Sequence, residues 1–474
     1  MKHNSWTLAG TSPLTIPFSY PSMQLRVLLF VALPLAMFFL GTVSAEAAIH
    51  YVRSGASGSA NGNDWTNAYT TLPSTLTRGD TYYIADGSYG GYTFDDGTSG
   101  TLVTTVKKAT LADHGTDTGW DSTYGDGQAT FSSQIEFTTS YWVFDGVTGG
   151  GAENNWNQNF GFKITETNDS DSVIRVAYTG TANNITISHV EMQGKGSVSS
   201  QGGYFSNDGL AVYNASNVTI SYFWIHGIGR CPFFISSQNF IAEHGWVQSY
   251  YGSSAVHSAL ASIWSFDGTV GNTTFRYNLI TDIESTGGLM WDNSDNHNAQ
   301  LAVYGNVFYR IPGAPWDNCC NGLVGGWAGG NGEDFYNARI YNNTFINVSG
   351  STVFTNFIIR SGDNIANNNL FYNTTATIDY SNIQTHNYSH YIASGGTRGE
   401  ANGTSATSGD PFVDYVNYNF SLRSTTAAGE TLPSPFNTDM FGNVRGADGV
   451  WDRGAFEFVN SATRPAAPAN LRIQ

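Results

Sequence analysis

Several residue types are scarce in this chain of 474 residues, and each scarcity excludes a class of protein. Charged residues make up only 12% and no lysine follows Lys195, so long solvent-exposed helices are not expected. Three cysteines in so long a chain exclude a disulfide scaffold. The net charge of −17, without a basic tract, excludes nucleic acid as a partner. Glycine (54) and aromatic residues (14%) are abundant instead, which is typical of turn-rich β-structure.

No apolar stretch reaches the roughly 20 residues that a membrane-spanning helix requires. The most apolar segment, "MQLRVLLFVALPLAMFFLGTVSAEA" at 23–47, has one positive charge, then an apolar run containing Pro34, then small residues. This order is typical of an export signal. We therefore predict a signal-peptide region over 1–47, in which Met23 is a second candidate start, and a secreted or cell-surface protein whose mature form has no membrane span.

A short motif recurs along the chain: an apolar residue, two further residues, asparagine, one residue, and a second apolar residue. It appears as Phe275/Asn278/Ile280, Val303/Asn306/Phe308, Ile340/Asn343/Phe345 and Ile365/Asn368/Leu370. The same apolar frame, with other residues in place of asparagine, is centred on Val190, Phe223 and His244. These centres are separated by about 21 to 37 residues, in the range of solenoid repeats. Because helical repeats keep a constant length, the variation favours stacked parallel strands joined by loops of different length.

Asparagine inside such a core needs partners, because an unpaired buried amide costs a few kcal/mol. In stacked rungs each amide can bond its neighbours and the adjoining turn, and asparagine tolerates the left-handed conformation of tight bends. We therefore interpret Asn278, Asn306, Asn343 and Asn368 as a structural ladder. Glycosylation-type sites such as Asn184 and Asn217 are interpreted as turn asparagines beside strand residues.

With this motif the chain resembles the secreted right-handed parallel β-helix proteins of the pectate-lyase-like superfamily, which contain an asparagine ladder. The resemblance also covers the opening segment at 51–94, with a short capping helix expected around Trp65–Leu72, and the closing segment "DMFGNVRGADGVWDRGAFEF" at 439–458. It implies an all-β, single-stranded solenoid over 49–458. The Pro/Ala-rich residues 459–474 are predicted to form a disordered tail. The superfamily contains lyases, hydrolases, epimerases, adhesins and inert domains, so the resemblance predicts the fold better than the activity.

The resemblance further implies that one flat sheet carries the functional cleft, here built from the strands expected within 209–214, 231–236, 257–264, 287–292, 322–327 and 352–357. The loops around its middle strands are rich in reactive side chains. The candidate catalytic residues are His257, Arg310, Glu284 and Asp292. The candidate substrate-binding residues are Arg230, Tyr250, Tyr251, Trp264 and Trp316. Aromatic rings beside charged acceptors form a surface suited to sugars, although a merely solvated rim would have the same composition.

Three reactions or roles remain open from the residues alone. Removal of a proton next to a uronate carboxyl requires a base, for which His257 or Arg310 qualifies, and a cation or arginine that neutralises the carboxylate. Asp292, Asp295 and Asp317 are candidate ligands of calcium, although "DNSDNHN" at 292–298 is also an ordinary turn sequence. Hydrolysis requires two carboxylates about 5–10 Å apart, for which Asp282/Glu284 or Asp292/Asp317 qualify. The polygalacturonase motifs are missing, so lyase is preferred to hydrolase.

The second class of function is a non-catalytic surface or matrix protein that binds glycans. In either class we expect a monomer that interacts with polysaccharide. Cys231 lies about three rungs, or roughly 14 Å, from the adjacent pair Cys319 and Cys320, which is too far for a disulfide. We therefore predict that Cys231 is unpaired, and the redox state of the adjacent pair stays open.

Overall fold

The computed structural model describes residues 47–168, 171–196, 207–248, 250–251, 259–263, 270–281, 283–285, 287–292, 298–312, 317–318, 322–326, 337–349, 352–355, 364–381 and 383–460. The predicted signal-peptide region up to residue 46 and the predicted tail from residue 461 lie outside the described residues. Within the described part, no helix is long and apolar enough to cross a membrane.

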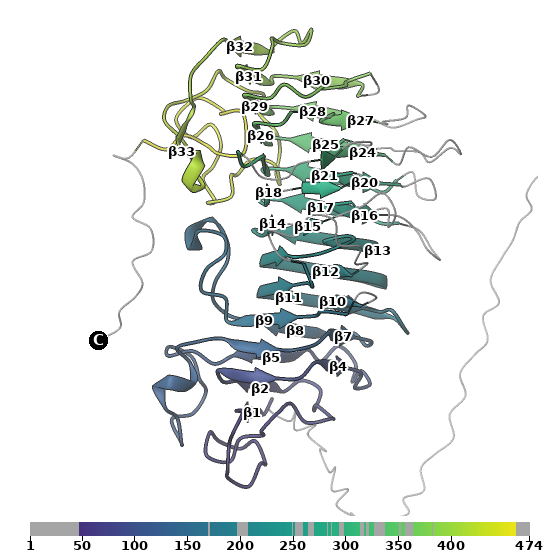
Figure 1. Ribbon diagram of the computed structural model, residues 1–474, viewed down its shortest axis with the longest axis vertical. Helices are drawn as coiled ribbons and strands as arrows, with labels where there is room; N and C mark the ends of the chain where they lie inside the picture. Colours follow the sequence, from purple (N-terminus) through teal and green to yellow (C-terminus); the bar gives the residue numbers. More distant parts are fainter. Residues whose placement is uncertain are drawn as a thin grey trace, which may run out of the picture. The chain divides into compact units, whose positions relative to one another are not determined.

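The strands form three parallel faces, and each strand pairs with the corresponding strand of the next rung (Figure 1). Face A consists of β1 (Ile49–Val52), β2 (Thr81–Ile84), β5 (Thr104–Lys108), β8 (Trp142–Asp145), the start of β11 (Ala182–Gln193), the middle of β12 (Asp208–His226), the end of β13 (Phe233–Glu243), β17 (Thr273–Arg276), β21 (Leu301–Tyr304), β25 (Ala338–Tyr341), β28 (Ile365–Asn367) and β30 (Thr385–Asn387).

Face B consists of β3 (Gly87–Tyr89), β6 (Ala129–Phe131), β9 (Phe162–Thr165), the ends of β11 and β12, β14 (Trp246–Gln248), β18 (Leu279–Thr281), β22 (Val307–Tyr309), β26 (Thr344–Ile346), β29 (Leu370–Tyr372), β31 (His390–Ile392) and β32 (Thr404–Ala406). Face C consists of β4 (Tyr92–Phe94), β7 (Ile135–Phe137), β10 (Ser172–Val176), the starts of β12 and β13, β16 (Ala261–Ile263), β20 (Leu289–Trp291), β24 (Val324–Gly326) and β27 (Phe354–Thr355). The chain therefore adopts the predicted right-handed parallel β-helix, and face C contains the predicted flat-sheet strands.

A few elements lie outside the three faces. A small parallel sheet at the corner between faces B and C consists of β15 (Tyr250–Tyr251), β19 (Ile283–Ser285) and β23 (Asp317–Asn318). An antiparallel pair consists of β33 (Phe412–Asp414) and β34 (Asn419–Leu422). The described 3-10 helices are η1 (Ser122–Tyr124), η2 (Ala152–Asn154) and η4 (Tyr415–Asn417).

The core is filled by inward apolar residues that stack at the spacing of the rungs. Phe308, Phe345, Phe371 and Tyr391 form one such file, with successive ring centroids 5.0 Å apart and nearly parallel planes. The separation matches the distance of about 4.8 Å between paired strands. Successive residues of each short strand point to opposite sides, so alternate residues supply the continuous core. The outward residues of several strands, such as Val307 and Tyr309, are also apolar and pack in a second cluster with the closing segment.

A left-handed residue at the turn from face A to face B places the ladder asparagines in the interior. The positive φ angles at Tyr277 (59°), Gly305 (65°), Asn342 (53°) and Asn368 (59°) mark this turn in successive rungs. The next residue then points inward, so Asn342 makes the turn and Asn343 joins the core. In the motif "RIYNNTFI" the two asparagines therefore have different structural roles.

The amides of the ladder are paired in a regular pattern. The Nδ2 of Asn278 donates to Asn306 Oδ1 (3.1 Å), that of Asn306 to Asn343 Oδ1 (3.0 Å), and that of Asn343 to Asn369 Oδ1 (3.1 Å). Each Nδ2 also donates to a main-chain carbonyl oxygen of the preceding rung, for example that of Asn306 to Phe275 O at 2.8 Å. The prediction is confirmed for three residues and wrong for Asn368, because the fourth member is Asn369.

The register also differs at His244, because Phe223 stacks on Gly245 rather than on His244. Gly245 N donates to Asn278 Oδ1 at 3.0 Å and so ends the ladder. A Cβ atom at Gly245 would lie 2.2 Å from Cζ of Phe223, so the phenyl ring leaves room only for glycine. His244 makes the left-handed turn instead, with φ of 54°.

The predicted capping helix around Trp65–Leu72 is not formed, and this prediction is wrong. These residues form bends and an isolated parallel bridge between Val52 and Tyr69. The segment is anchored by Trp65, which is fully buried and packs against Tyr51 and Trp120 at centroid distances of 4.9 and 5.0 Å. Aromatic packing therefore replaces the helix at this end.

The closing segment packs on the last rungs through buried charged groups. The guanidinium of Arg453 donates to Ser389 O (2.9 Å), Thr404 Oγ1 (3.0 Å) and Ala428 O (2.6 Å). Gly454 N donates to Asn368 O at 2.7 Å. These bonds fasten the closing segment to the turns and loops of the last rungs.

Candidate functional site

The corner between faces B and C brings several of the predicted site residues to neighbouring rungs. In the corner sheet, Tyr251 of β15 pairs with Glu284 of β19, which pairs with Asp317 of β23. Parallel strands lie about 4.8 Å apart, so these three backbone positions form one file. Arg230, Tyr250 and Arg310 belong to the same corner of their rungs. We call this set of six residues the B/C corner.

Arg310 follows β22 and is held by the neighbouring rung. Its main-chain N donates to Ile346 O at 3.1 Å, and its guanidinium donates to the hydroxyl of Ser349. Its side chain is only partly buried. Within the described part of the chain, Arg310 forms no ion pair with a carboxylate. A partly exposed guanidinium is suited to bind an anionic group of a ligand.

Arg230 differs from Arg310 because it is already paired. Its Nε donates to Asp208 Oδ1 at 2.7 Å, its Nη2 donates to Asp208 Oδ2, and its guanidinium lies 5.0 Å from the ring centroid of Phe234. The Asp208 side chain is almost fully buried. Such a bidentate pair is costly to break, so Asp208 fixes the position of Arg230 at the corner. The predicted role of Arg230 in substrate binding stays a prediction.

Cys231 is buried and free, as predicted. Burial raises the pKa of its thiol to about 12, so it stays protonated and unreactive. Its main-chain N donates to Asp208 Oδ1 at 3.2 Å, which ties it to the Arg230 pair. Cys319 and Cys320 lie outside the described residues.

Asp292 lies at the other end of face C from the B/C corner. It follows β20, and its main-chain N donates to Ile263 O at 2.9 Å. The predicted carboxylate pair Asp292/Asp317 is therefore separated by the length of a face C strand, whereas Glu284 and Asp317 lie on adjacent strands. Among the described side chains, no group of three or more His, Cys, Asp or Glu residues is arranged to bind a metal ion.

Several predicted site residues lie outside the described residues, namely His257, Trp264, Asp295 and Trp316, together with Asp282. The side chains of Tyr250, Tyr251, Glu284 and Asp317 are likewise not described, so their placement is that of the backbone.

A second polar site on face B was not anticipated from the sequence. Glu191 accepts hydrogen bonds from Lys163 Nζ (2.6 Å), and its Oε1 also lies 3.2 Å from His226 Nε2. Burial alone would raise the pKa of Glu191, but His226 and Lys163 lower it to about 2. Trp224 stacks on His226 at a centroid distance of 3.9 Å and donates to Gln248 Oε1 at 3.2 Å. We call these five residues the Glu191 cluster.

The Glu191 cluster comes from the outward positions of four successive rungs, the last of which supplies Gln248. Lys163 pairs with Glu191, which pairs with Trp224. In the sequence these residues occupy alternate positions of the short strands "FKIT", "VEMQ" and "FWIH". That alternation marks them as outward, but only the pairing of the strands shows that they meet.

No protein-family model and no curated protein matches this chain. Among nine matching chains of solved structures is the pectate lyase Pel9A, at 13% sequence identity and a TM-score of 0.42, covering 87% of this chain and 96% of that one. Another is an alginate lyase of the PL6 family, at 13% identity and a TM-score of 0.34, covering 81% of this chain and 57% of that one. The strand pairing itself defines the protein as a parallel β-helix.

Proposed function

We propose that the protein is exported and cleaves uronate-containing polysaccharide by β-elimination at the B/C corner. The observation that carries this proposal is the position of the partly exposed Arg310 at the same corner of the rungs as the backbone file of Tyr251, Glu284 and Asp317. In a protein with a net charge of −17, such an arginine is a specific place for an anionic sugar to bind.

The proposed reaction needs three contributions from the corner. Arg310 binds the uronate carboxylate and so acidifies the proton on the neighbouring carbon. A base removes that proton, a double bond forms, and the glycosidic oxygen leaves with a proton from an acid or water. His257 is the proposed base, with Arg310 as the alternative. Tyr250 and Tyr251 would support the sugar rings.

Calcium fits this proposal only in part. Glu284 and Asp317 lie on adjacent strands and would supply carboxylate ligands, whereas Asp292 lies at the opposite end of face C. When bound, the cation would neutralise the uronate carboxylate together with Arg310.

The test is a panel of alginate, pectate and glycosaminoglycans incubated with the protein while the ultraviolet absorbance of unsaturated products is recorded. We expect activity on at least one polymer and a loss of about 100-fold or more in Arg310→Ala, as for removal of a transition-state donor. Arg339→Ala is the matched control, because Arg339 is an arginine of face A in the next rung. Equal activity of Arg310→Ala and the parent protein would refute the assignment of Arg310.

A second candidate function is glycan binding without cleavage, and the Glu191 cluster favours it. Its low-pKa carboxylate and its partly exposed indole suit hydrogen bonding and stacking with sugars rather than proton transfer. Binding of the same polymers without unsaturated products, and weaker binding by Trp224→Ala, would support this function over the lyase.

Hydrolysis is the third candidate. The adjacent backbone positions of Glu284 and Asp317 resemble the spacing of about 5 Å between the carboxylates of retaining enzymes. New reducing ends without ultraviolet absorbance would identify this reaction.

A further inference from the structure

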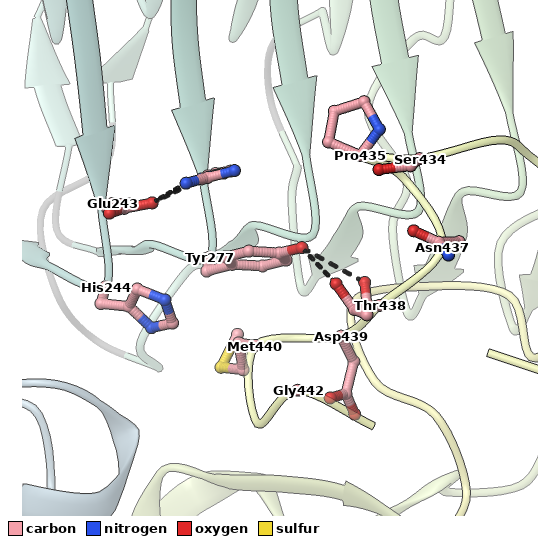
Figure 2. Close-up of a pocket in the computed structure, with 11 residues that line it drawn as sticks. Glu243, His244, Tyr277, Ser434, Pro435, Asn437, Thr438, Asp439, Met440 and Gly442 are labelled. Carbon is pink, nitrogen blue, oxygen red and sulfur yellow. Dashed lines mark hydrogen bonds and ion pairs between the residues drawn. The ribbon is translucent and has the colours of Figure 1, made fainter. Parts of the chain in front are cut away.

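A pocket lies at the turn from face A to face B, where a loop of the closing segment covers the strands (Figure 2). Its volume is about 410 Å³. Glu243, His244, Arg276 and Tyr277 form the wall on the side of the β-helix, and residues 434–442 form the opposite wall. This pocket lies at a different corner of the rungs from the B/C corner.

Both walls of the pocket are held by hydrogen bonds, so the pocket is preformed. The Tyr277 hydroxyl donates to Thr438 O at 3.3 Å and lies 3.1 Å from Thr438 Oγ1, which joins the two walls. Asp439 Oδ1 accepts from the main-chain N of Phe441 and of Asn443, each at 2.9 Å. The loop therefore keeps its shape without a ligand.

His244 supplies unused hydrogen-bonding groups to the pocket. Its ring stacks on Tyr222 at 5.0 Å and lies 5.2 Å from the ring of Tyr277. Among the described residues, neither ring nitrogen has a hydrogen-bond partner. Burial lowers the pKa of His244 to about 4, so the imidazole is neutral and offers one donor and one acceptor.

The charges in the pocket disfavour an anion. Arg276 is paired with Glu243 through its Nε at 2.5 Å and donates from Nη1 to the Tyr304 hydroxyl at 2.9 Å. Its charge is therefore compensated, and Asp439 adds a further carboxylate. The buried guanidinium of Arg445 donates to Thr438 O at 3.3 Å and lies close to Asp439, so that charge is also compensated. Among the residues that line the pocket, no cation is left without a carboxylate, so a uronate or phosphate would find no ion-pair partner, whereas an uncharged ligand needs none.

We propose that this pocket binds a neutral sugar unit, whose hydroxyl groups bond to His244 and Glu243 between the walls that Tyr277 and Met440 line. A volume of about 410 Å³ is in the usual range for small-ligand sites. The inference does not depend on cleavage at the B/C corner. A second attachment point on another corner would raise the avidity for a polymer that contains both neutral and acidic sugars.

The test is calorimetric titration of the full chain with the neutral probes maltotriose, cellotriose, mannotriose and galactotriose, and with trigalacturonate. We expect at least one neutral probe to bind and trigalacturonate to bind at least tenfold more weakly at this site. His244→Phe keeps an aromatic ring in the stack but removes both nitrogens, and it should weaken neutral binding at least tenfold. Tyr222→Phe, in the neighbouring rung outside the pocket, is the matched control and should bind as the parent does.

The NMR signal of the Met440 methyl group, recorded during the same titration of the parent protein, shows whether the probe binds in this pocket. This measurement does not depend on the folding of any variant. Binding with a shift of this signal supports the proposal. Absence of binding by all four neutral probes, binding without a shift at Met440, or unchanged binding by His244→Phe would overturn it. None of these results depends on whether unsaturated products form, so this inference and the proposed lyase activity can fail separately.

Discussion

Replacing one central ladder residue tests the physical basis of the fold directly. In Asn306→Ala the main-chain N of Asn278 loses Asn306 Oδ1 (3.0 Å), and the Phe275 carbonyl loses Asn306 Nδ2 (2.8 Å). Two neighbouring hydrogen bonds remain in the variant. The main-chain N of residue 306 still donates to Asn343 Oδ1, and Asn278 Nδ2 still donates to Ala242 O. The buried main-chain N–H of Asn278 is thus left unpaired, whereas the Phe275 carbonyl loses one hydrogen bond and keeps its strand partner in the rung of Tyr304.

An unpaired buried group costs about 1–3 kcal/mol and a lost hydrogen bond about 0.5–1.5 kcal/mol, so Asn306→Ala should lower the free energy of unfolding by about 2–4 kcal/mol. Asn306→Asp should cost more, because its carboxylate cannot donate and would face Phe275 O and Asn343 Oδ1. Chemical denaturation measures the decrease in the free energy of unfolding. Faster hydrogen exchange at the main-chain N–H of Asn278 should show that this group has lost its acceptor.

An exposed asparagine file provides the control. Asn217 is exposed, has a φ of 56°, and its Nδ2 donates to Asn184 Oδ1 at 3.1 Å. Water can replace these bonds and glycine suits the left-handed conformation, so Asn217→Gly should change stability by less than about 0.5 kcal/mol. If Asn306→Ala cost no more than Asn217→Gly, and the Asn278 amide stayed protected, the ladder would not be a stabilising element.

Two further predictions concern the neighbouring rung. Gly245→Ala should lower stability by about 1–3 kcal/mol through overpacking against Phe223, whereas Gly90→Ala, where no atom lies within 4 Å, should be nearly neutral in the same denaturation assay. His244, whose pKa falls from 6.5 to about 4 on burial, binds fewer protons in the folded than in the unfolded state between these values. Stability should therefore decrease as the pH falls through this window, by up to about 3 kcal/mol from this residue. His244→Tyr introduces the residue type that Tyr277 already has at the same turn of the next rung. This variant should lack the contribution of His244 to the pH dependence of thermal unfolding. A pH profile equal to that of the parent protein would contradict the prediction.

The candidate site was less predictable than the core. The sequence places Tyr251, Glu284, Arg310 and Asp317 in the loops around the middle strands of the predicted sheet, but their spacing along the chain does not indicate which of them share one corner and which lie at the opposite end, as Asp292 does. The Glu191 cluster went unrecognised for the same reason, since Lys163 and His226 are distant in sequence. Both groups form because parallel rungs bring together residues that loops of unequal length separate.

The sequence by itself determined which residues face inward, because the alternation within each short strand and the asparagine after each turn are local properties. It could not decide the register within "NNN" at 367–369, where three identical residues fit the motif and only the left-handed turn at Asn368 selects Asn369. Nor could it show that the ladder position is occupied by Phe223 and Gly245 in the two rungs that precede Asn278. Those outcomes, and every group of side chains that meets across rungs, were decided by the tertiary structure, because stacking fixes neighbours that the chain alone leaves far apart.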